Sequence, residues 1–181
     1  MITDRAEELS RRLRAEGEAT LAFFKTLTPA QWEWKIYPGN GPQEGGGQPI
    51  WTAKEVLAHF VAAEKGFHAL VQDVMNGGSG AEPGLDVDTY NAITVNELRG
   101  QEVDVLLGQM AMVRERSAAL VAGLSPDQLA RRGRHPALGE STLDEMVRVI
   151  YHHNSLHLRD VRQALKPLGP TDPSLGRSPE A

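Results

Sequence analysis

The chain contains six histidines, and three of them fall within seven residues, in "YHHNSLH" at 151–157. His153 and His157 are four residues apart, so on a helix they share one face, one turn above the other. His152 is rotated by about 100° from His153 and belongs to a neighbouring face. Two imidazoles on one face can meet a single metal ion, but a tight site needs a third ligand from another element.

His59 is the candidate for that third ligand, because it lies among apolar positions of a helix predicted to begin at "TAKE" (52–55). His68 is nine residues further along and points to the opposite side of the same helix, so it cannot serve the same site. His135 lies in a loop. Three neutral imidazoles leave one coordination position open, as in catalytic zinc sites. The alternative is that these histidines bind no metal and only form hydrogen bonds in the core.

The spacing of "HNSLH" (153–157) also matches the H-E-x-x-H motif of zinc proteases, but Asn154 stands where the glutamate base is needed. An amide cannot take a proton from water at neutral pH, so the sequence does not predict a zinc protease of this type. Glu55 and Asp160 are candidates for orienting the imidazoles, with capping or solvation as the alternative. Tyr151 and Asn154 are candidates for contacting a bound ligand.

Four long helices must position these side chains. The apolar periodicity predicts them over residues 3–27, 52–75, 102–122 and 142–166, with a shorter helical stretch near 88–99. Thr52 and Thr142 each precede a glutamate by three residues, which is the pattern of a capping box. No run of residues predicts a strand. Four amphipathic helices of this length predict an all-α protein, a four-helix bundle.

Composition narrows the class of protein. The chain has 181 residues, a formal net charge of -5 and no cysteine. The charge excludes attraction to nucleic acid or to an anionic membrane surface. The lack of cysteine excludes disulfides, thiolate metal ligands and a cysteine nucleophile. The N-terminus lacks the apolar region of a signal peptide, and no apolar run approaches the roughly 18 residues of a membrane span. We therefore expect a cytoplasmic protein.

The length suits one domain, and we expect the helical bundle to occupy residues 1–166. Residues 167–181 contain four prolines and few apolar residues, which predicts a disordered C-terminal tail. "PGNGPQEGGGQP" at 38–49 contains five glycines and three prolines and reads as a flexible surface loop. It lacks the lysine and the strand-to-helix context of a phosphate-binding loop.

"WTAKEVLAHFVAAEKGF" (51–67) and "YHHNSLHLRDVRQAL" (151–165) resemble the DinB/YfiT-like superfamily of metal-binding helical bundles. In that family a W-[ST]-x-x-[ED]-x-[LV]-x-H helix supplies one histidine ligand and a late H-x-x-x-H helix supplies two. His59, His153 and His157 fall on those positions, and the resemblance covers residues 3–166. It implies an up-down-down-up bundle, a divalent metal (zinc or nickel) held by the three histidines and water, and a homodimer.

The relatives implied by this resemblance include thiol S-transferases that use low-molecular-weight thiols such as bacillithiol, and the mycothiol-dependent maleylpyruvate isomerase. A bound metal lowers the pKa of a coordinated water or thiol, so either could serve as a nucleophile at neutral pH. Since the chain has no cysteine, any thiol must come from a small molecule. The expected function is therefore metal-dependent thiol transfer or hydrolysis of a small molecule. The alternative is a non-catalytic or stress-related interaction protein whose metal site is structural or vestigial.

Overall fold

The computed structural model describes residues 4–37 and 51–168. Its elements, in chain order, are α1 (Asp4–Phe24), α2 (Pro29–Trp32), α3 (Ala53–Met75), α4 (Val87–Leu98), α5 (Val103–Ala122), α6 (Pro126–Leu129), β1 (Arg132–His135), β2 (Gly139–Thr142), α7 (Leu143–Leu165) and a 3₁₀ turn, Lys166–Leu168. The predicted loop at 38–49 and the predicted tail from residue 169 onward lie outside the described residues. Residues 167 and 168 belong to the 3₁₀ turn. None of the described helices is long and apolar enough to cross a membrane.

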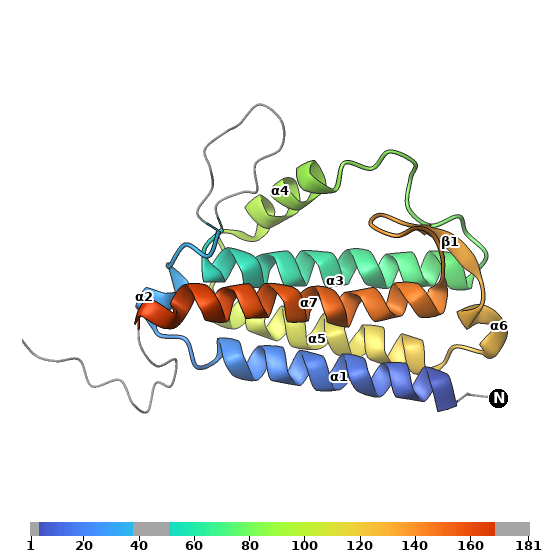
Figure 1. Cartoon of the computed structure of the whole chain (residues 1–181), viewed down its shortest axis with the longest axis horizontal. Coiled ribbons are helices and arrows are strands. Elements are labelled where there is room, and N and C mark those ends of the chain that lie inside the picture. Colours follow the sequence, from blue (N-terminus) through green and yellow to red (C-terminus); the bar gives the residue numbers. More distant parts are fainter. Residues whose placement is uncertain (1–3, 38–50, 169–181) are drawn as a thin grey trace, which may run out of the picture.

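The four long helices α1, α3, α5 and α7 lie side by side as a bundle (Figure 1). Helices α1 and α7 run in one direction, and α3 and α5 run in the other. Helix α4 carries the chain back along the outside of α3, which is why α3 and α5 can be parallel. The all-α class and the up-down-down-up order of the four helices are therefore confirmed.

The two helices that carry the predicted ligands begin at the predicted capping boxes. The Thr52 side chain accepts a hydrogen bond from the Glu55 backbone N–H, and the glutamate accepts one from the Thr52 N–H. Thr142 and Glu145 do the same at the start of α7. Each box satisfies two backbone donors that the first helical turn leaves free. The start of each helix is thereby fixed, and with it the faces on which the histidines lie.

The segment between α6 and α7 departs from the sequence prediction, which placed His135 in a loop and expected no strand. Strands β1 and β2 form an antiparallel hairpin in which Arg132 pairs with Thr142. Gly139 has φ +68°, in the left-handed region that glycine adopts without strain. A Cβ on Gly133 would lie 2.7 Å from Val74 Cγ2, so the hairpin packs closely on the end of α3. Its residues lack the apolar alternation that signals a strand, and tertiary contacts hold it instead.

The buried apolar side chains form two clusters, one toward each end of the bundle. The first includes Phe24, Trp32, Trp51, Phe60, Met110 and Leu158. The second includes Leu9, Leu13, Phe67, Val121, Met146 and Ile150. Each long helix contributes to both clusters, because its apolar stripe runs the full length of the bundle.

A layer of buried polar side chains lies between the two clusters. Arg114 of α5 is only 3% exposed and donates to Glu16 of α1 at 2.5 Å and to Glu64 of α3 at 3.0 Å. Asn154 of α7, 1% exposed, donates to Glu16 at 3.4 Å. A Cβ on Gly17 would lie 2.7 Å from Arg114 Cγ, so the glycine makes room for the arginine. All four long helices thus meet in one hydrogen-bonded network.

Candidate metal centre

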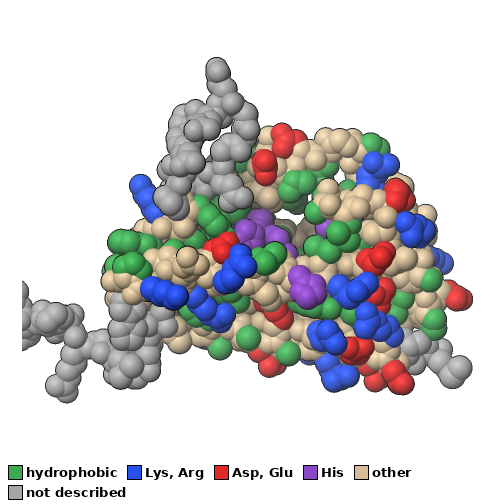
Figure 2. Space-filling model, viewed as in Figure 1, with side chains coloured by type: hydrophobic (Ala, Val, Ile, Leu, Met, Phe, Trp, Pro, Cys, Tyr) green, Lys and Arg blue, Asp and Glu red, His purple; other side chains and the backbone are tan. Residues whose placement is uncertain are grey.

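His59 of α3 and His153 and His157 of α7 converge inside the bundle. His153 Nε2 lies 3.0 Å from His59 Nε2 and 3.1 Å from His157 Nε2. One ligand atom from each of the three residues can be chosen so that all three atoms lie within 4.8 Å of one another. Figure 2 shows histidine side chains beside an opening in the middle of one face of the molecule. The structure therefore brings together the three residues that the sequence selected.

The hydrogen bonds of Asn154 fix the tautomer of His153. The Glu16 carboxylate is held by Arg114 and can only accept, so the Asn154 amide nitrogen faces it at 3.4 Å. The Asn154 carbonyl oxygen then faces His153 Nδ1 at 3.2 Å and accepts a hydrogen bond from its N–H. His153 Nε2 is left with a lone pair directed toward the other two histidines.

Tyr37 holds His157 in the corresponding way. Its hydroxyl donates to the Asp160 carboxylate at 3.3 Å, and its oxygen lies 2.6 Å from His157 Nδ1, from which it accepts a hydrogen bond. The lone pair of His157 therefore resides on Nε2. Such contacts orient metal-binding imidazoles and set which nitrogen is free.

His59 is the most deeply buried of the three, at 3% exposure. The Trp51 ring lies against it, with the ring centroids 4.7 Å apart. Its Nδ1 has no hydrogen-bond partner among the residues that the structure describes. Packing against Trp51 and the contact of Nε2 with His153 therefore set the orientation of this ring in the described part of the chain.

The donor set fits a divalent metal ion. His153 and His157 present two lone pairs 3.1 Å apart, an arrangement that is repulsive unless a cation lies between them. Ligand nitrogens about 2.9 to 3.3 Å apart are what octahedral or tetrahedral geometry requires at zinc-type bond lengths. Burial lowers the pKa of all three imidazoles, so they are neutral and able to bind a metal at neutral pH.

The metal-free protein is expected to lose stability between about pH 6.5 and pH 4. Burial, and then the neighbouring His153, lower the pKa of His157 from 6.5 to about 4. In that range the unfolded chain binds a proton that the folded chain does not, so the free energy of unfolding falls as the pH falls. A shift of this size corresponds to about 3 kcal/mol. Urea unfolding across this range measures the slope, and His157→Phe should flatten it. An unchanged slope in that variant would contradict the expectation.

Replacing Tyr37 with phenylalanine is expected to weaken metal binding without removing a ligand. The variant loses the oxygen that accepts from His157 Nδ1, and losing such a partner typically costs about 10- to 100-fold in metal affinity. Competition with a chromogenic chelator measures the affinity. Tyr90→Phe is the matched control, because the Tyr90 hydroxyl lies beside Gly66 in the wall of a neighbouring pocket and does not contact His157 Nδ1, which faces Tyr37. Equal affinities in both variants would show that Tyr37 does not support the site.

His152 and His68 lie apart from this centre, as their helical positions predicted. His152 is exposed on the outer face of α7. His68 Nδ1 faces Ser117 of α5 at 3.5 Å. His135, which the sequence left unplaced, lies at the end of β1 and lines a neighbouring pocket together with His59 and His153.

Several supporting roles differ from the sequence interpretation. Glu55 caps α3 and pairs with Arg99 at 2.6 Å, so the capping alternative holds for it. Asp160 acts on His157 through Tyr37. Tyr151 is buried in the second apolar cluster, and Asn154 orients His153. The role of Tyr37 was missed because no local pattern links residue 37 to residue 157.

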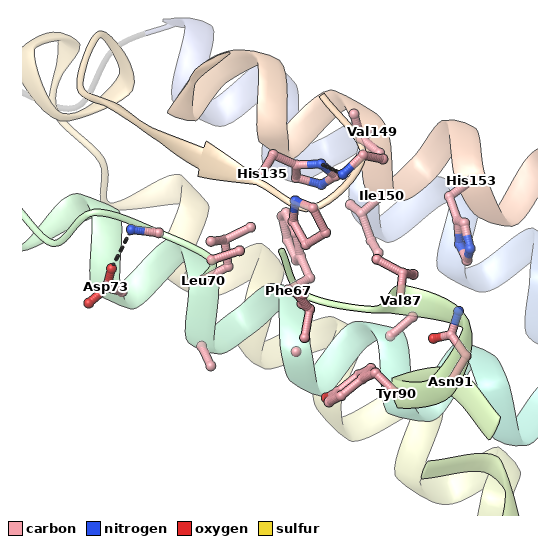
Figure 3. A pocket seen from close by; sticks show the side chains of 18 of the residues that line it. Phe67, Leu70, Asp73, Val87, Tyr90, Asn91, His135, Val149, Ile150 and His153 are labelled. Atoms are coloured by element: carbon pink, nitrogen blue, oxygen red, sulfur yellow. Dashed lines mark hydrogen bonds between the residues drawn. The ribbon is translucent and has the colours of Figure 1, made fainter. Parts of the chain in front are cut away.

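A pocket of about 490 Å³ adjoins the histidines and lies between α3, α4, α7 and the hairpin. Figure 3 shows His153 at one end and Asp73 at the other, with His135, Ile150 and Phe67 between them. A small molecule in this pocket would lie directly against a metal held by the three histidines.

Residues 12–161 match the model of the DinB superfamily, which is most of the chain. The chain belongs to the DinB superfamily. A comparison with curated proteins finds no match.

Solved structures of other proteins share the fold of this DinB superfamily chain. YfiT from Bacillus subtilis, described as a probable metal-dependent hydrolase with an unusual four-helix bundle topology, is 16% identical, with a TM-score of 0.72 over 93% of this chain and 91% of that one. The mycothiol-dependent maleylpyruvate isomerase is 14% identical, with a TM-score of 0.67 over 86% of this chain and 60% of that one. The DinB-like protein YjoA from Bacillus subtilis is 15% identical, with a TM-score of 0.54 over 91% and 94%. At these identities the likeness establishes the fold alone.

Proposed function

We propose that the protein binds a divalent metal ion, zinc or nickel, through His59, His153 and His157, and that it is a metal-dependent hydrolase or thiol transferase acting on a small molecule. The observation that carries the proposal is the convergence of three imidazole Nε2 atoms at the end of a largely apolar pocket. The shared fold with YfiT and with the mycothiol-dependent isomerase supports it.

The residues of the chain prepare the site in three ways. Burial keeps the three imidazoles neutral, so they do not offset the charge of a bound ion. Asn154 and Tyr37 hold two of the rings with Nε2 turned inward. The apolar pocket wall limits the water that reaches the reacting groups. When bound, the metal would lower the pKa of a water or a small thiol and so provide the nucleophile.

The test combines metal analysis with an activity screen. Protein purified without a histidine tag should contain one metal ion per chain by mass spectrometry. A screen of generic electrophiles and ester substrates, with and without several small thiols, should show turnover that a chelator removes and that metal restores. A metal content near zero after growth with zinc and nickel would refute the metal site.

A non-catalytic role, with a structural or vestigial metal, is the second candidate. It is favoured because Glu16 and Asp160, the two carboxylates linked to the histidines, are engaged by Arg114 and Tyr37. Neither is a free acid or base. Unfolding caused by a chelator, together with no turnover under any condition of the screen, would support this candidate. We also propose that the protein is a homodimer, which light scattering would test.

A further inference from the structure

The pocket beside the histidines has a size and lining that restrict what it can hold. Its volume of about 490 Å³ falls in the range typical of small-molecule sites, roughly 300 to 1,000 Å³. Most of its wall is apolar, as in Ala63, Phe67, Leu70, Val87, Val149 and Ile150. The few polar side chains along it therefore decide which molecules it accepts; they are His59, Asp73, Tyr90, Asn91, His135 and His153.

His135 offers a fixed hydrogen-bond donor in this wall. Its Nδ1 accepts from the backbone N–H groups of Ala137 at 3.0 Å and Leu138 at 3.2 Å, in the turn of the hairpin. A nitrogen that accepts two hydrogen bonds carries the lone pair, so the proton of the neutral ring is on Nε2. Burial, and then His153, lower the pKa of His135, which favours this neutral form. The turn thus fixes both the ring and its tautomer.

The described part of the pocket wall carries no lysine or arginine. Its one carboxylate, Asp73, accepts a hydrogen bond from the Gly80 backbone N–H at 2.8 Å. An anion that binds against this wall would lose its hydrating water without gaining a cationic partner from the wall, and such desolvation of an unpaired charge is costly. A neutral molecule with one acceptor would lose little and would gain the His135 hydrogen bond.

We propose that the pocket takes a small uncharged molecule with an apolar body, and that His135 is the specificity-determining residue that donates its Nε2–H to one carbonyl or ether oxygen of that molecule. The inference deepens the proposed function, since the histidine centre would act on the molecule so bound. Binding itself does not require the metal, so the two proposals can fail separately.

Three compounds of the same shape test whether the pocket prefers an uncharged molecule with one hydrogen-bond acceptor. Benzylacetone is neutral with one acceptor, hydrocinnamate replaces its methyl group with a charged oxygen, and isopentylbenzene replaces its carbonyl oxygen with a methyl group. Calorimetric titration of metal-free and metal-loaded protein gives the affinities. In the metal-free protein, benzylacetone should bind at least about tenfold more tightly than hydrocinnamate, because burying an uncompensated charge costs more than one hydrogen bond contributes.

His135→Asn isolates the donor. An asparagine oxygen can accept from the N–H two residues on, so it preserves the turn while withdrawing the donor from the pocket. The variant should bind benzylacetone about three- to tenfold more weakly, the size of one net hydrogen bond, and isopentylbenzene within twofold of the original affinity. Ala63→Leu, which adds three carbon atoms to the pocket wall, should weaken the binding of both.

Three results would overturn the inference. The first is hydrocinnamate binding to metal-free protein as tightly as benzylacetone does. The second is a His135→Asn variant whose affinity falls equally for all three compounds, or falls for none of them. The third is no measurable binding of any compound, or binding that Ala63→Leu leaves intact. Failure of the catalytic proposal would instead appear as absent turnover with these binding preferences unchanged.

Discussion

His153→Ala is expected to remove metal binding, from one ion per chain to none that survives desalting. His153 Nε2 lies within 3.1 Å of the Nε2 atoms of both His59 and His157, so its loss leaves two ligands from different helices. Two imidazoles are too few for a tight site. Mass spectrometry of desalted protein measures the metal content. The melting temperature should rise on zinc addition in the original protein and stay unchanged in the variant, because a ligand that binds only the folded state stabilises it.

The matched control for this variant is His152→Ala. It removes the same side chain one residue away, from the exposed face of α7. Its metal content and its response to zinc should equal those of the original protein. Metal content that is unchanged in His153→Ala, or equally reduced in both variants, would contradict the placement of the site.

The helices and the three central histidines could be predicted because local rules govern them. Capping boxes at Thr52 and Thr142 fix where α3 and α7 begin, and the 3.6-residue period then places each histidine on a face. The pairing of His59 with residues almost a hundred positions later needed more than periodicity. It rested on the apolar surroundings of each histidine and on the resemblance to a family of helical bundles.

Features that depend on long-range contacts could not be predicted. Arg114 and Glu64 belong to types that usually lie on the surface, yet they are 3% and 0% exposed because each neutralises the other. Tyr37 reaches His157 across 120 positions of sequence. The hairpin residues carry no strand pattern of their own. In each case a partner distant in sequence determines where the residue lies and how deeply it is buried. The local sequence pattern either predicts nothing about that residue or predicts a solvated side chain.

Arg114→Met is expected to reduce the free energy of unfolding by about 3 to 5 kcal/mol, the usual cost of removing one member of a buried ion pair. The change keeps the volume of the side chain but leaves Glu16 and Glu64 without their cation. Burial raises the pKa of Glu64, and Arg114 opposes that rise. The folded variant should therefore bind a proton at Glu64 more readily than the unfolded chain does. Its loss of stability should be larger at pH 8 than at pH 5, as urea unfolding would show.

Arg14→Met is the matched control, because Arg14 also joins α1 to α5 by an ion pair, with Glu115, at the exposed surface. It should cost no more than about 1 kcal/mol. If both variants lose the same free energy of unfolding, the buried network stabilises the protein no more than an exposed ion pair does. The network also reaches the three central histidines, since Glu16 accepts a hydrogen bond from Asn154 and Asn154 orients His153. Arg114→Met should consequently weaken zinc affinity as well, whereas Arg14→Met should leave it unchanged. If Arg114→Met lowers the free energy of unfolding but leaves zinc affinity unchanged, the network only holds the four helices together and does not support the histidines.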